Sequence, residues 1–268
     1  MTFPADPGII DPALLILAYR AGLFPMADSR DDDEVFWVEP KRRAILPLDG
    51  FHLSRSLART LRRGRFSVTC NEAFAEVIDA CAEPRPADGD AEDGSGDGGG
   101  TWISHRIRAS YIALHQGGQA HSIECWQEGR LVGGLYGVGF DRVFCGESMF
   151  SRVPDASKVA LAWLVAALRG AGAELLDCQF MTTHLASLGA VEISQKRYVD
   201  LLNRAQRPYA TGSVRAGEGV GAGVGVAAGV GVPLALPAGF AALLGDAAAA
   251  GSSSSPGNFI AQSLTHTS

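Results

Sequence analysis

Three strand-like segments in the middle of this chain are joined by turns too short for anything except hairpins. The segments span residues 120–127, 130–138 and 142–150, and only Glu-Gly and Gly-Phe-Asp separate them. Connections of two or three residues join antiparallel neighbours, whereas a parallel pair needs a crossover of a dozen or more residues. The sequence therefore predicts an antiparallel β-meander that the rest of the fold must accommodate.

Helical patterns lie on both sides of the predicted meander. Apolar residues recur at helical spacing in three segments before it and in two segments after it. Asp155 is a candidate N-cap for the first of the later helices, and residues 174–180 between the later helices resemble a strand. This order of elements predicts an α+β layer fold. The helical segments are 56–64, 71–82, 104–118, 156–169 and a closing helix at 195–206.

Changes in composition divide the chain into three regions. We expect a small N-terminal α+β domain over residues 1–53, with a strand at 35–40, and a larger domain over residues 54–208. An acidic, glycine-rich stretch at 84–100 interrupts the larger domain as a flexible loop. The tail at 209–268 is rich in Gly, Ala and Val. Its prolines and dense glycines disfavour a membrane span and predict a low-complexity, disordered tail.

Charge and cysteine usage exclude few partners but limit the class of site. The net charge of −6 lies mostly in the acidic loop, so the folded part remains compatible with an anionic partner. The five cysteines are scattered and none forms a C-x-x-C pair, which disfavours both a zinc site and a disulfide framework. The N-terminus lacks the features of a signal peptide. We expect a cytoplasmic protein with free thiols and no bound metal.

One carboxylate lies within the third strand of the meander. Glu147 is surrounded by apolar and small residues, and burying an unpaired carboxylate costs several kcal/mol. Strand alternation places Glu147 on one face with Cys145 and Met149, and it places Asp177 and Gln179 on a common face of the later strand. Because one helix separates the two strands, we expect the three polar groups to converge. The alternative is that Glu147 points to solvent and that Asp177 caps a nearby group.

Basic residues gather on one predicted helix. Arg55, Arg59, Arg62 and Arg63, which we call the arginine stripe, share one helical face, and no acidic residue interrupts the segment. Residues 41–43 form a second basic cluster. An anionic partner such as RNA explains both, and a solvated helix face is the alternative.

Several motifs, in order and spacing, resemble the leucyl/phenylalanyl-tRNA–protein transferase family. They include HSIECW, LVGGLYGV, FCGESMFSR, LLDCQF and HLASLGAVEIS, with VFWVEPKRRAILPL and GTWISHRI before them, and the similarity covers residues 11–208. The resemblance implies a GNAT-like acyltransferase domain with an antiparallel or mixed central sheet flanked by helices. It also implies transfer of leucine or phenylalanine from aminoacyl-tRNA to proteins with N-terminal arginine or lysine. Such acceptors are marked for N-end rule degradation, and no cofactor is needed.

The same resemblance implies roles for individual residues. Asp177 would polarise the Gln179 amide, the Gln179 carbonyl would accept a hydrogen bond from the attacking amine, and Glu147 would orient that amine or the basic side chain. The aminoacyl side chain would lie among Leu135, Met149, Leu161, Leu164 and Leu176. The terminal adenosine would stack near Trp37, Trp102 and Phe144, and tRNA phosphates would contact Arg55, Arg59, Arg62 and Arg63.

Two other functions compete with this resemblance. An acetyl-CoA-dependent GNAT N-acetyltransferase would need a glycine-rich phosphate turn, and residues 151–158 at that position contain no glycine. A non-catalytic RNA-binding module would fit the arginine stripe but would leave the three polar groups without a task. Met26 and Leu135 depart from the family's usual aromatic and methionine, so the preference between leucine and phenylalanine stays open. We expect a monomer.

Overall fold

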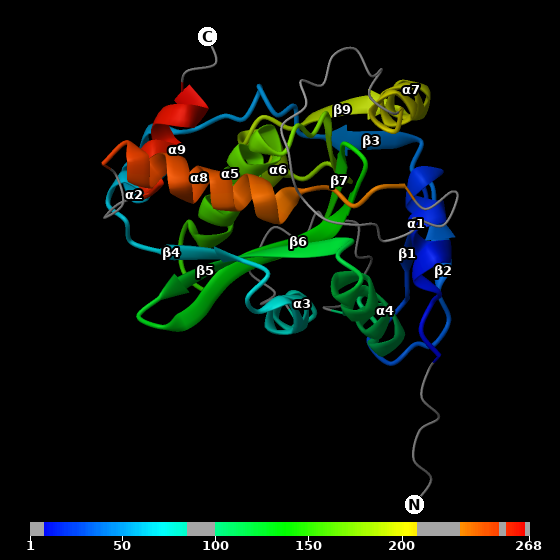
Figure 1. The fold of residues 1–268 in the computed structure, drawn as a ribbon. Coiled ribbons are helices and arrows are strands. Elements are labelled where there is room, and N and C mark those ends of the chain that lie inside the picture. The colour runs from blue at the N-terminus through cyan, green and yellow to red at the C-terminus, as the bar shows by residue number, and fades with distance from the viewer. Residues whose placement is uncertain (1–7, 85–99, 208–230, 252–255, 266–268) are drawn as a thin grey trace, which may run out of the picture.

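The computed structural model describes residues 8–84, 100–207, 231–251 and 256–265, and these form a fold around one mixed sheet (Figure 1). The β7–β8 pair is parallel, and the other neighbouring strands pair antiparallel. The predicted α+β class, with a mixed central sheet flanked by helices, is therefore confirmed. In spatial order the strands are β4 (Ser67–Cys70), β5 (Ala120–Gln127), β6 (Arg130–Phe140), β7 (Val143–Ser151), β8 (Leu175–Gln179), β3 (Arg42–Ile45) and β9 (Val191–Ser194).

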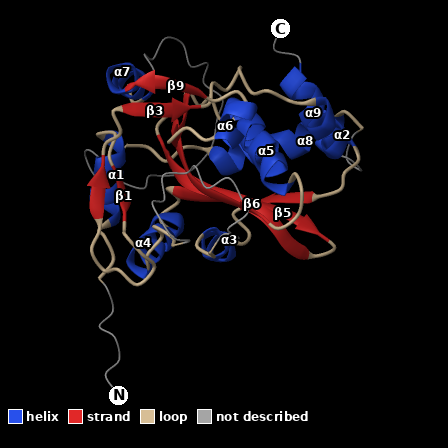
Figure 2. Cartoon of the chain, turned by 180° about the vertical axis from the view of Figure 1, so that it is seen from behind, coloured by secondary structure: helices blue, strands red, loops and turns tan. Residues whose placement is uncertain are grey.

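Helices cover both faces of this sheet (Figure 2). On one face α5 (Ala156–Gly170) packs on β5, β6 and β7, and we call its apolar cluster the α5-side core. On the other face α3 (Phe74–Cys81) and α4 (His105–Gln116) bury the α4-side core. The remaining elements are α1 (Pro12–Arg20), α2 (Arg55–Arg62), α6 (Thr183–Ser187), α7 (Gln195–Ala205), α8 (Leu236–Ala249), α9 (Pro256–Thr265) and the separate antiparallel pair β1 (Phe24–Met26) and β2 (Phe36–Val38).

The predicted meander is confirmed as β5, β6 and β7. Glu128 and Gly129 connect the first two strands, and both have positive φ, 53° and 72°. A two-residue type I′ hairpin turn requires this backbone because its twist matches that of the strands. β6 is longer than predicted and runs to Phe140, so the second turn begins at Asp141.

Four short strands were not expected from the sequence. β1, β3, β4 and β9 have only three or four residues, which is too short for alternation to be recognised. β3 has the largest consequence, because it comes from the predicted N-terminal domain and inserts between β8 and β9 of the large sheet. The domain boundary at residue 53 stays a prediction.

Serine caps begin several of the helices. The hydroxyl oxygens of Ser54, Ser104 and Ser194 accept hydrogen bonds from the backbone N–H three residues later, at 3.2–3.3 Å. Asp155 occupies the predicted N-cap of α5, but its side chain does not cap the helix. Its φ is 72°, and its carboxylate accepts a hydrogen bond from Thr60 at 3.3 Å instead. The predicted N-cap position of Asp155 is therefore confirmed, but its carboxylate contacts α2 and does not cap the helix.

The tail contains two packed helices, so the prediction of disorder is wrong for residues 231–251 and 256–265. Phe240 of α8 packs on Trp163 of α5 with ring centroids 5.4 Å apart, and Arg169 of α5 donates to Ser263 O of α9 at 3.2 Å. Burial of the apolar faces of α8 and α9 against α5 and α2 stabilises helices that their glycine-rich sequence does not favour. α7 is consequently not the closing helix.

Residues 85–99 of the acidic loop and 208–230 of the tail lie outside the described residues. Across the described ranges, no helix has both the length and the apolar content that a membrane crossing requires.

Close glycine contacts fix α8 and α9, and they give a test of this packing. A Cβ at Gly239 would overlap the carbonyl oxygen of Ala167, and one at Gly257 would overlap that of Leu61, whereas Gly245 has open space. We expect Gly239→Ala and Gly257→Ala to lower the free energy of unfolding by about 1–3 kcal/mol. Gly245→Ala should raise it by about 0.5–1 kcal/mol, because alanine favours a helix interior. Thermal melting of the three variants checks this, and a Gly239→Ala protein more stable than wild type would contradict it.

Candidate active site

The predicted convergence of three polar groups occurs where β7 and β8 lie side by side. The strands are parallel neighbours, with Cys145 opposite Asp177. Gln179 Nε2 donates to Glu147 Oε1 at 3.1 Å, and the Gln179 backbone N–H donates to Asp177 Oδ1 at 2.9 Å. Asp177 and Gln179 are buried and Glu147 is half-buried. The alternative with Glu147 pointing to solvent, away from the other two residues, is therefore excluded.

A β-bulge in β7 decides where Glu147 points. The pairing between β6 and β7 shifts register at Glu147, which is left without an opposite residue. On one side of the bulge Cys145 packs in the α4-side core, and on the other side Met149 packs against the α5-side core. The prediction that Met149 shares a face with Glu147 and Cys145 is wrong, because period-two alternation holds only along an uninterrupted ladder.

Asp177 lies in a buried ion pair. Arg43 Nε donates to Oδ1 at 2.9 Å and Arg43 Nη2 donates to Oδ2 at 2.5 Å, while the Tyr198 hydroxyl donates to Oδ2 at 3.0 Å. Arg43 Nη1 also donates to Gly22 O at 3.0 Å, and its guanidinium lies 4.9 Å from the Phe24 ring centroid. Burial alone would lower the pKa of Arg43, but attraction to Asp177 outweighs it and raises that pKa.

The sequence predicts that Arg43 joins its two neighbours in a basic cluster open to an anionic partner, and for Arg43 this is wrong. Its side chain is 2% exposed, whereas Lys41 and Arg42 are exposed and Arg42 forms an ion pair with Glu192 of β9. The reason is the insertion of β3 into the sheet, because alternate residues of an inner strand must face a packed layer. The supposed second basic cluster therefore has one buried member that faces Asp177.

Gln179 adopts an unusual backbone conformation at the end of β8. Its φ is 55°, in the left-handed region that residues other than glycine rarely occupy. Such conformations persist where surrounding contacts enforce them, and they are enriched at functional sites. The Asp177 carboxylate accepts from the Gln179 backbone, not from its side-chain amide. The expected polarisation of that amide by Asp177 is therefore replaced by a contact between the amide and Glu147.

Two tyrosines complete the environment of Glu147. The Tyr111 hydroxyl of α4 donates to Glu147 Oε2 at 2.9 Å, and the Tyr19 hydroxyl of α1 is hydrogen-bonded to Tyr111. Burial raises the pKa of Glu147 to about 7, and hydrogen bonds from the two tyrosines only partly oppose this. A carboxylate that titrates near pH 7 can exchange a proton with an amine.

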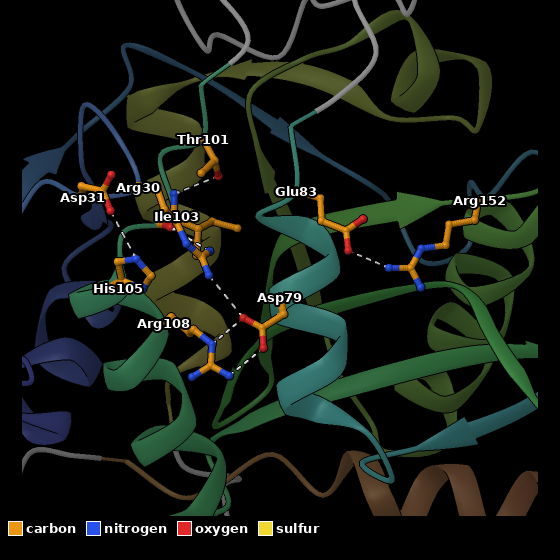
Figure 3. Close-up of polar contacts among 9 residues, drawn as sticks. All are labelled: Arg30, Asp31, Asp79, Glu83, Thr101, Ile103, His105, Arg108 and Arg152. Carbon is orange, nitrogen blue, oxygen red and sulfur yellow. Dashed lines mark hydrogen bonds and ion pairs between the residues drawn. The ribbon is translucent and has the colours of Figure 1, made fainter.

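Ion pairs fix the position of the helix that carries Tyr111. Figure 3 shows Arg108 of α4 forming a fork to Asp79 of α3, with distances of 2.5 and 2.6 Å. A second pair, between Glu83 and Arg152 at 2.8 Å, ties the end of α3 to the residue after β7. The hydrogen bond from Arg108 is the main reason that the pKa of Asp79 is lowered. These pairs link α3 to α4 and to the residue after β7, and because they are partly exposed they contribute little to stability.

The residues predicted to bind the aminoacyl side chain lie together on the α5 face. The leucines are buried and the methionine is partly buried, while the polar groups lie toward the α4 face. The paired residues of β7 and β8 end at Cys145 and Asp177, although both strands continue beyond this point. Groups from the two faces can therefore approach each other where the pairing ends. The five residues predicted to bind the aminoacyl side chain are Leu135, Met149, Leu161, Leu164 and Leu176.

The aromatic residues predicted to stack on adenosine lie in different environments. Trp37 on β2 is 39% exposed, and Trp102 is half-buried against the α4-side core. Phe144 is fully buried in the α5-side core. The stacking role predicted for Phe144 is wrong for this structure, because a side chain without exposed surface cannot receive a base.

All four residues of the arginine stripe are exposed. α2 turns Leu57, Ala58 and Leu61 inward, so the basic face is directed to solvent as its periodicity predicts.

Sequence reasoning missed Arg43, Tyr198, Tyr19 and Tyr111 as members of the site. Tyr111 lies at helical spacing between Ile107 and Leu114, which places a hydroxyl in an apolar face and requires a buried partner. That pattern could have identified it. No comparable local pattern identifies Arg43, whose partner lies 134 residues away.

The chain matches one family of known proteins. The family model described as leucyl/phenylalanyl-tRNA protein transferase matches residues 45–203, and the model of that transferase's N-terminal domain matches residues 8–41. Three relatives bear the name leucyl/phenylalanyl-tRNA–protein transferase. The protein from Novosphingobium aromaticivorans is 68% identical over 98% of both chains. Those from Rhizorhabdus wittichii and Zymomonas mobilis are 60% and 57% identical, over 73% and 76% of this chain and 75% and 72% of theirs.

Among solved structures, one match is the C-terminal (DUF2156) domain of a proposed lysylphosphatidylglycerol synthetase from Agrobacterium fabrum. It is 15% identical with a TM-score of 0.34, and the match covers 75% of this chain and 59% of that one. A similarity this low carries no structural argument.

Proposed function

This chain belongs to the leucyl/phenylalanyl-tRNA protein transferase family, and we propose that Gln179, Glu147 and Asp177 organise its transfer reaction. It is an aminoacyltransferase that moves leucine or phenylalanine from aminoacyl-tRNA to the N-terminus of a protein. The observation that carries the proposal is the hydrogen bond from the Gln179 amide to Glu147, at the point where β7 and β8 stop pairing.

The reaction forms one C–N bond and breaks one C–O bond. The neutral α-amine of the acceptor attacks the ester carbonyl, the 3′-oxygen of the terminal ribose leaves, and the proton lost by the amine ends on that oxygen. Since an α-amino group has a pKa of about 7.7–8.0, little driving force is needed to deprotonate it. With its Nε2 donating to Glu147, Gln179 turns its carbonyl oxygen to the attacking amine. The enzyme acts mainly by holding two reactants in position.

Glu147 gives this site its preference for a cationic acceptor. An ionised carboxylate at the site attracts the cationic side chain of an N-terminal arginine or lysine and orients the amine beside it. Tyr111 holds one carboxylate oxygen and Gln179 the other, so the charge is oriented in advance. We therefore propose acceptors with N-terminal Arg or Lys, which the N-end rule pathway would then degrade.

The donor is held by apolar contacts and by charge. We propose that the leucine or phenylalanine side chain enters between β6, β7, β8 and α5, where a flexible methionine adapts to either shape. Trp37 and Trp102 offer aromatic surface for the terminal adenosine. The arginine stripe of α2 would bind acceptor-stem phosphates, and this contact should weaken steeply as salt rises.

Three finer assignments belong to the same proposal. A mixed sheet in which β7 and β8 pair over only part of their length supports a GNAT-like acyltransferase fold. We propose a cytoplasmic location, because the aminoacyl-tRNA donor is used there in translation. A site assembled from one chain is compatible with a monomer.

A transfer assay tests the function directly. Leucyl-tRNA labelled in the leucine is mixed with a protein that begins with arginine, and label joined to the protein by a peptide bond is measured. The same acceptor with an acetylated N-terminus is the control, because it lacks a nucleophilic amine. Acetyl-CoA in place of the tRNA tests the competing acetyltransferase function. Absence of label in the first reaction, with tRNA bound, would favour a non-catalytic RNA-binding module.

The raised pKa of Glu147 gives a prediction for the pH dependence of transfer. Both Glu147 and the acceptor amine must lose a proton, so log kcat/KM should rise below pH 7 with a slope approaching about two. Glu147→Gln should be slower, and its slope should fall to about one, because only the amine still titrates. Equal slopes for the two proteins would contradict the requirement for an ionised Glu147. The groups that face Glu147 are Tyr19 of α1, Arg43 of β3, Tyr111 of α4, Tyr136 of β6, Cys145 of β7 and Asp177 of β8.

A further inference from the structure

The left-handed conformation of Gln179 needs a contact that enforces it. Gln179 carries a Cβ, and residues with a Cβ rarely occupy a φ of 55°. The contact is the hydrogen bond from the Gln179 backbone N–H to Asp177 Oδ1. If that oxygen moves, the backbone is free to relax to negative φ, and the amide then points away from Glu147.

Asp177 cannot hold this position alone, because it is a fully buried carboxylate. Its Oδ1 accepts from Arg43 Nε as well as from Gln179, and its Oδ2 accepts from Arg43 Nη2 and from Tyr198. The two parallel bonds of the guanidinium fork fix both the distance and the plane of the carboxylate. A lysine ammonium group at the same site would fix the distance to the carboxylate but not the plane of the carboxylate.

Arg43 is itself held by groups from three other elements. Its guanidinium lies 4.9 Å from the Phe24 ring centroid and 4.3 Å from the Tyr198 ring centroid, and it donates to Gly22 O at 3.0 Å. Its side chain is only 2% exposed. The orientation of the fork is therefore set by β1, α7 and the turn after α1.

We propose that Arg43 is a positioning residue for aminoacyl transfer, which acts through Asp177 to hold Gln179 in its left-handed conformation. Arg43 touches neither reactant. The inference rests on the proposed function of Gln179 in the reaction. It extends the site to β3, a strand that the sequence had assigned to the N-terminal domain.

A purely structural Arg43 and a positioning Arg43 differ in which kinetic constant changes. Without the fork, the plane of the Asp177 carboxylate is no longer fixed, and the Gln179 N–H loses a correctly placed acceptor. Arg43→Gln should therefore lose kcat while KM for the acceptor and affinity for tRNA stay unchanged. A structural role alone would lower the melting temperature and leave kcat of the folded protein unchanged.

The experiment compares four full-length variants with wild type. Arg43→Gln removes the cation, Arg43→Lys keeps a charge without the fork, and Tyr198→Phe removes one hydrogen bond from Asp177 while keeping the ring. Lys196→Gln is the control, because it removes a cation from an exposed pair on the same helix as Tyr198. Thermal melting, tRNA binding, and kcat and KM for the acceptor are measured for each protein.

The expected result is a loss in kcat with unchanged KM and tRNA affinity. Arg43→Lys should lose kcat at least about tenfold, as for one charge-assisted hydrogen bond, and Tyr198→Phe about threefold. Wild-type kcat in Arg43→Lys and Tyr198→Phe would overturn the inference even if Arg43→Gln does not fold. An Arg43→Gln protein that folds and keeps the wild-type kcat would overturn it as well. Failure of the proposed function is distinguishable from failure of this inference, because the wild-type protein would then transfer no leucine.

Discussion

Replacement of Gln179 by alanine should lower kcat for transfer about 10²–10⁴-fold, which is the range for a group that assists proton transfer from a reacting amine. In the proposed mechanism this change removes the amide that bridges Glu147 and the attacking nitrogen, while the apolar residues on the α5 face and the arginine stripe stay intact. Affinity for tRNA should therefore be unchanged. Single-turnover transfer from leucyl-tRNA, measured beside a tRNA binding curve, separates the two effects.

Gln179→Asn is the matched variant for this experiment. Asparagine tolerates the left-handed backbone and keeps the amide, but its side chain is one methylene shorter. It should lose activity nearly as severely, because a displacement of about 1 Å can cost 10²-fold in rate. Activity within about threefold of wild type in both variants would rule out Gln179 as the group that guides the amine.

The second large effect is on stability. Asp177→Ala should lower the free energy of unfolding by about 3–5 kcal/mol, because it leaves the Arg43 guanidinium charged and buried without a carboxylate partner. A loss of that size corresponds to a decrease of about 10 °C in melting temperature for a chain of this length. Loss of transfer in Asp177→Ala is therefore not by itself a measure of chemistry. Differential scanning calorimetry beside the transfer assay checks this.

Two comparisons make the stability prediction specific. Asp200→Ala removes an exposed partner of Lys196 and should change stability by less than about 1 kcal/mol. The double variant Arg43→Met with Asp177→Leu replaces both charges by apolar groups and should regain most of the stability without regaining transfer. If Asp177→Ala has the same melting temperature as wild type, the buried pair is not what holds β3 against β8.

The site was predicted in part from the sequence. Glu147 stood out because a carboxylate in an apolar strand needs a partner, and a single crossover helix made its meeting with Asp177 and Gln179 plausible. Alternation could not show that Glu147 lies in a bulge, since a bulge is a property of two paired strands. For the same reason Met149 was assigned to the wrong face.

The tail shows the same limit at the level of whole helices. The glycines at 239 and 257 look like helix breakers in a one-dimensional pattern. In the fold they are contact points, where α8 approaches α5 and α9 approaches α2 too closely for a side chain. Composition alone therefore predicted disorder for segments that packing orders.

What the sequence alone determined about this protein is local: the hairpins, the helix periods, the polar residues on adjacent strands and the motifs that place it in a family. These depend on residues within a few positions of one another, so their pattern is visible without coordinates. Tertiary structure alone decided that Arg43 pairs with Asp177, 134 residues away, and that Gln179 is held at positive φ. Both depend on where β3 enters the sheet, and that is set by the free energy of the assembled layers.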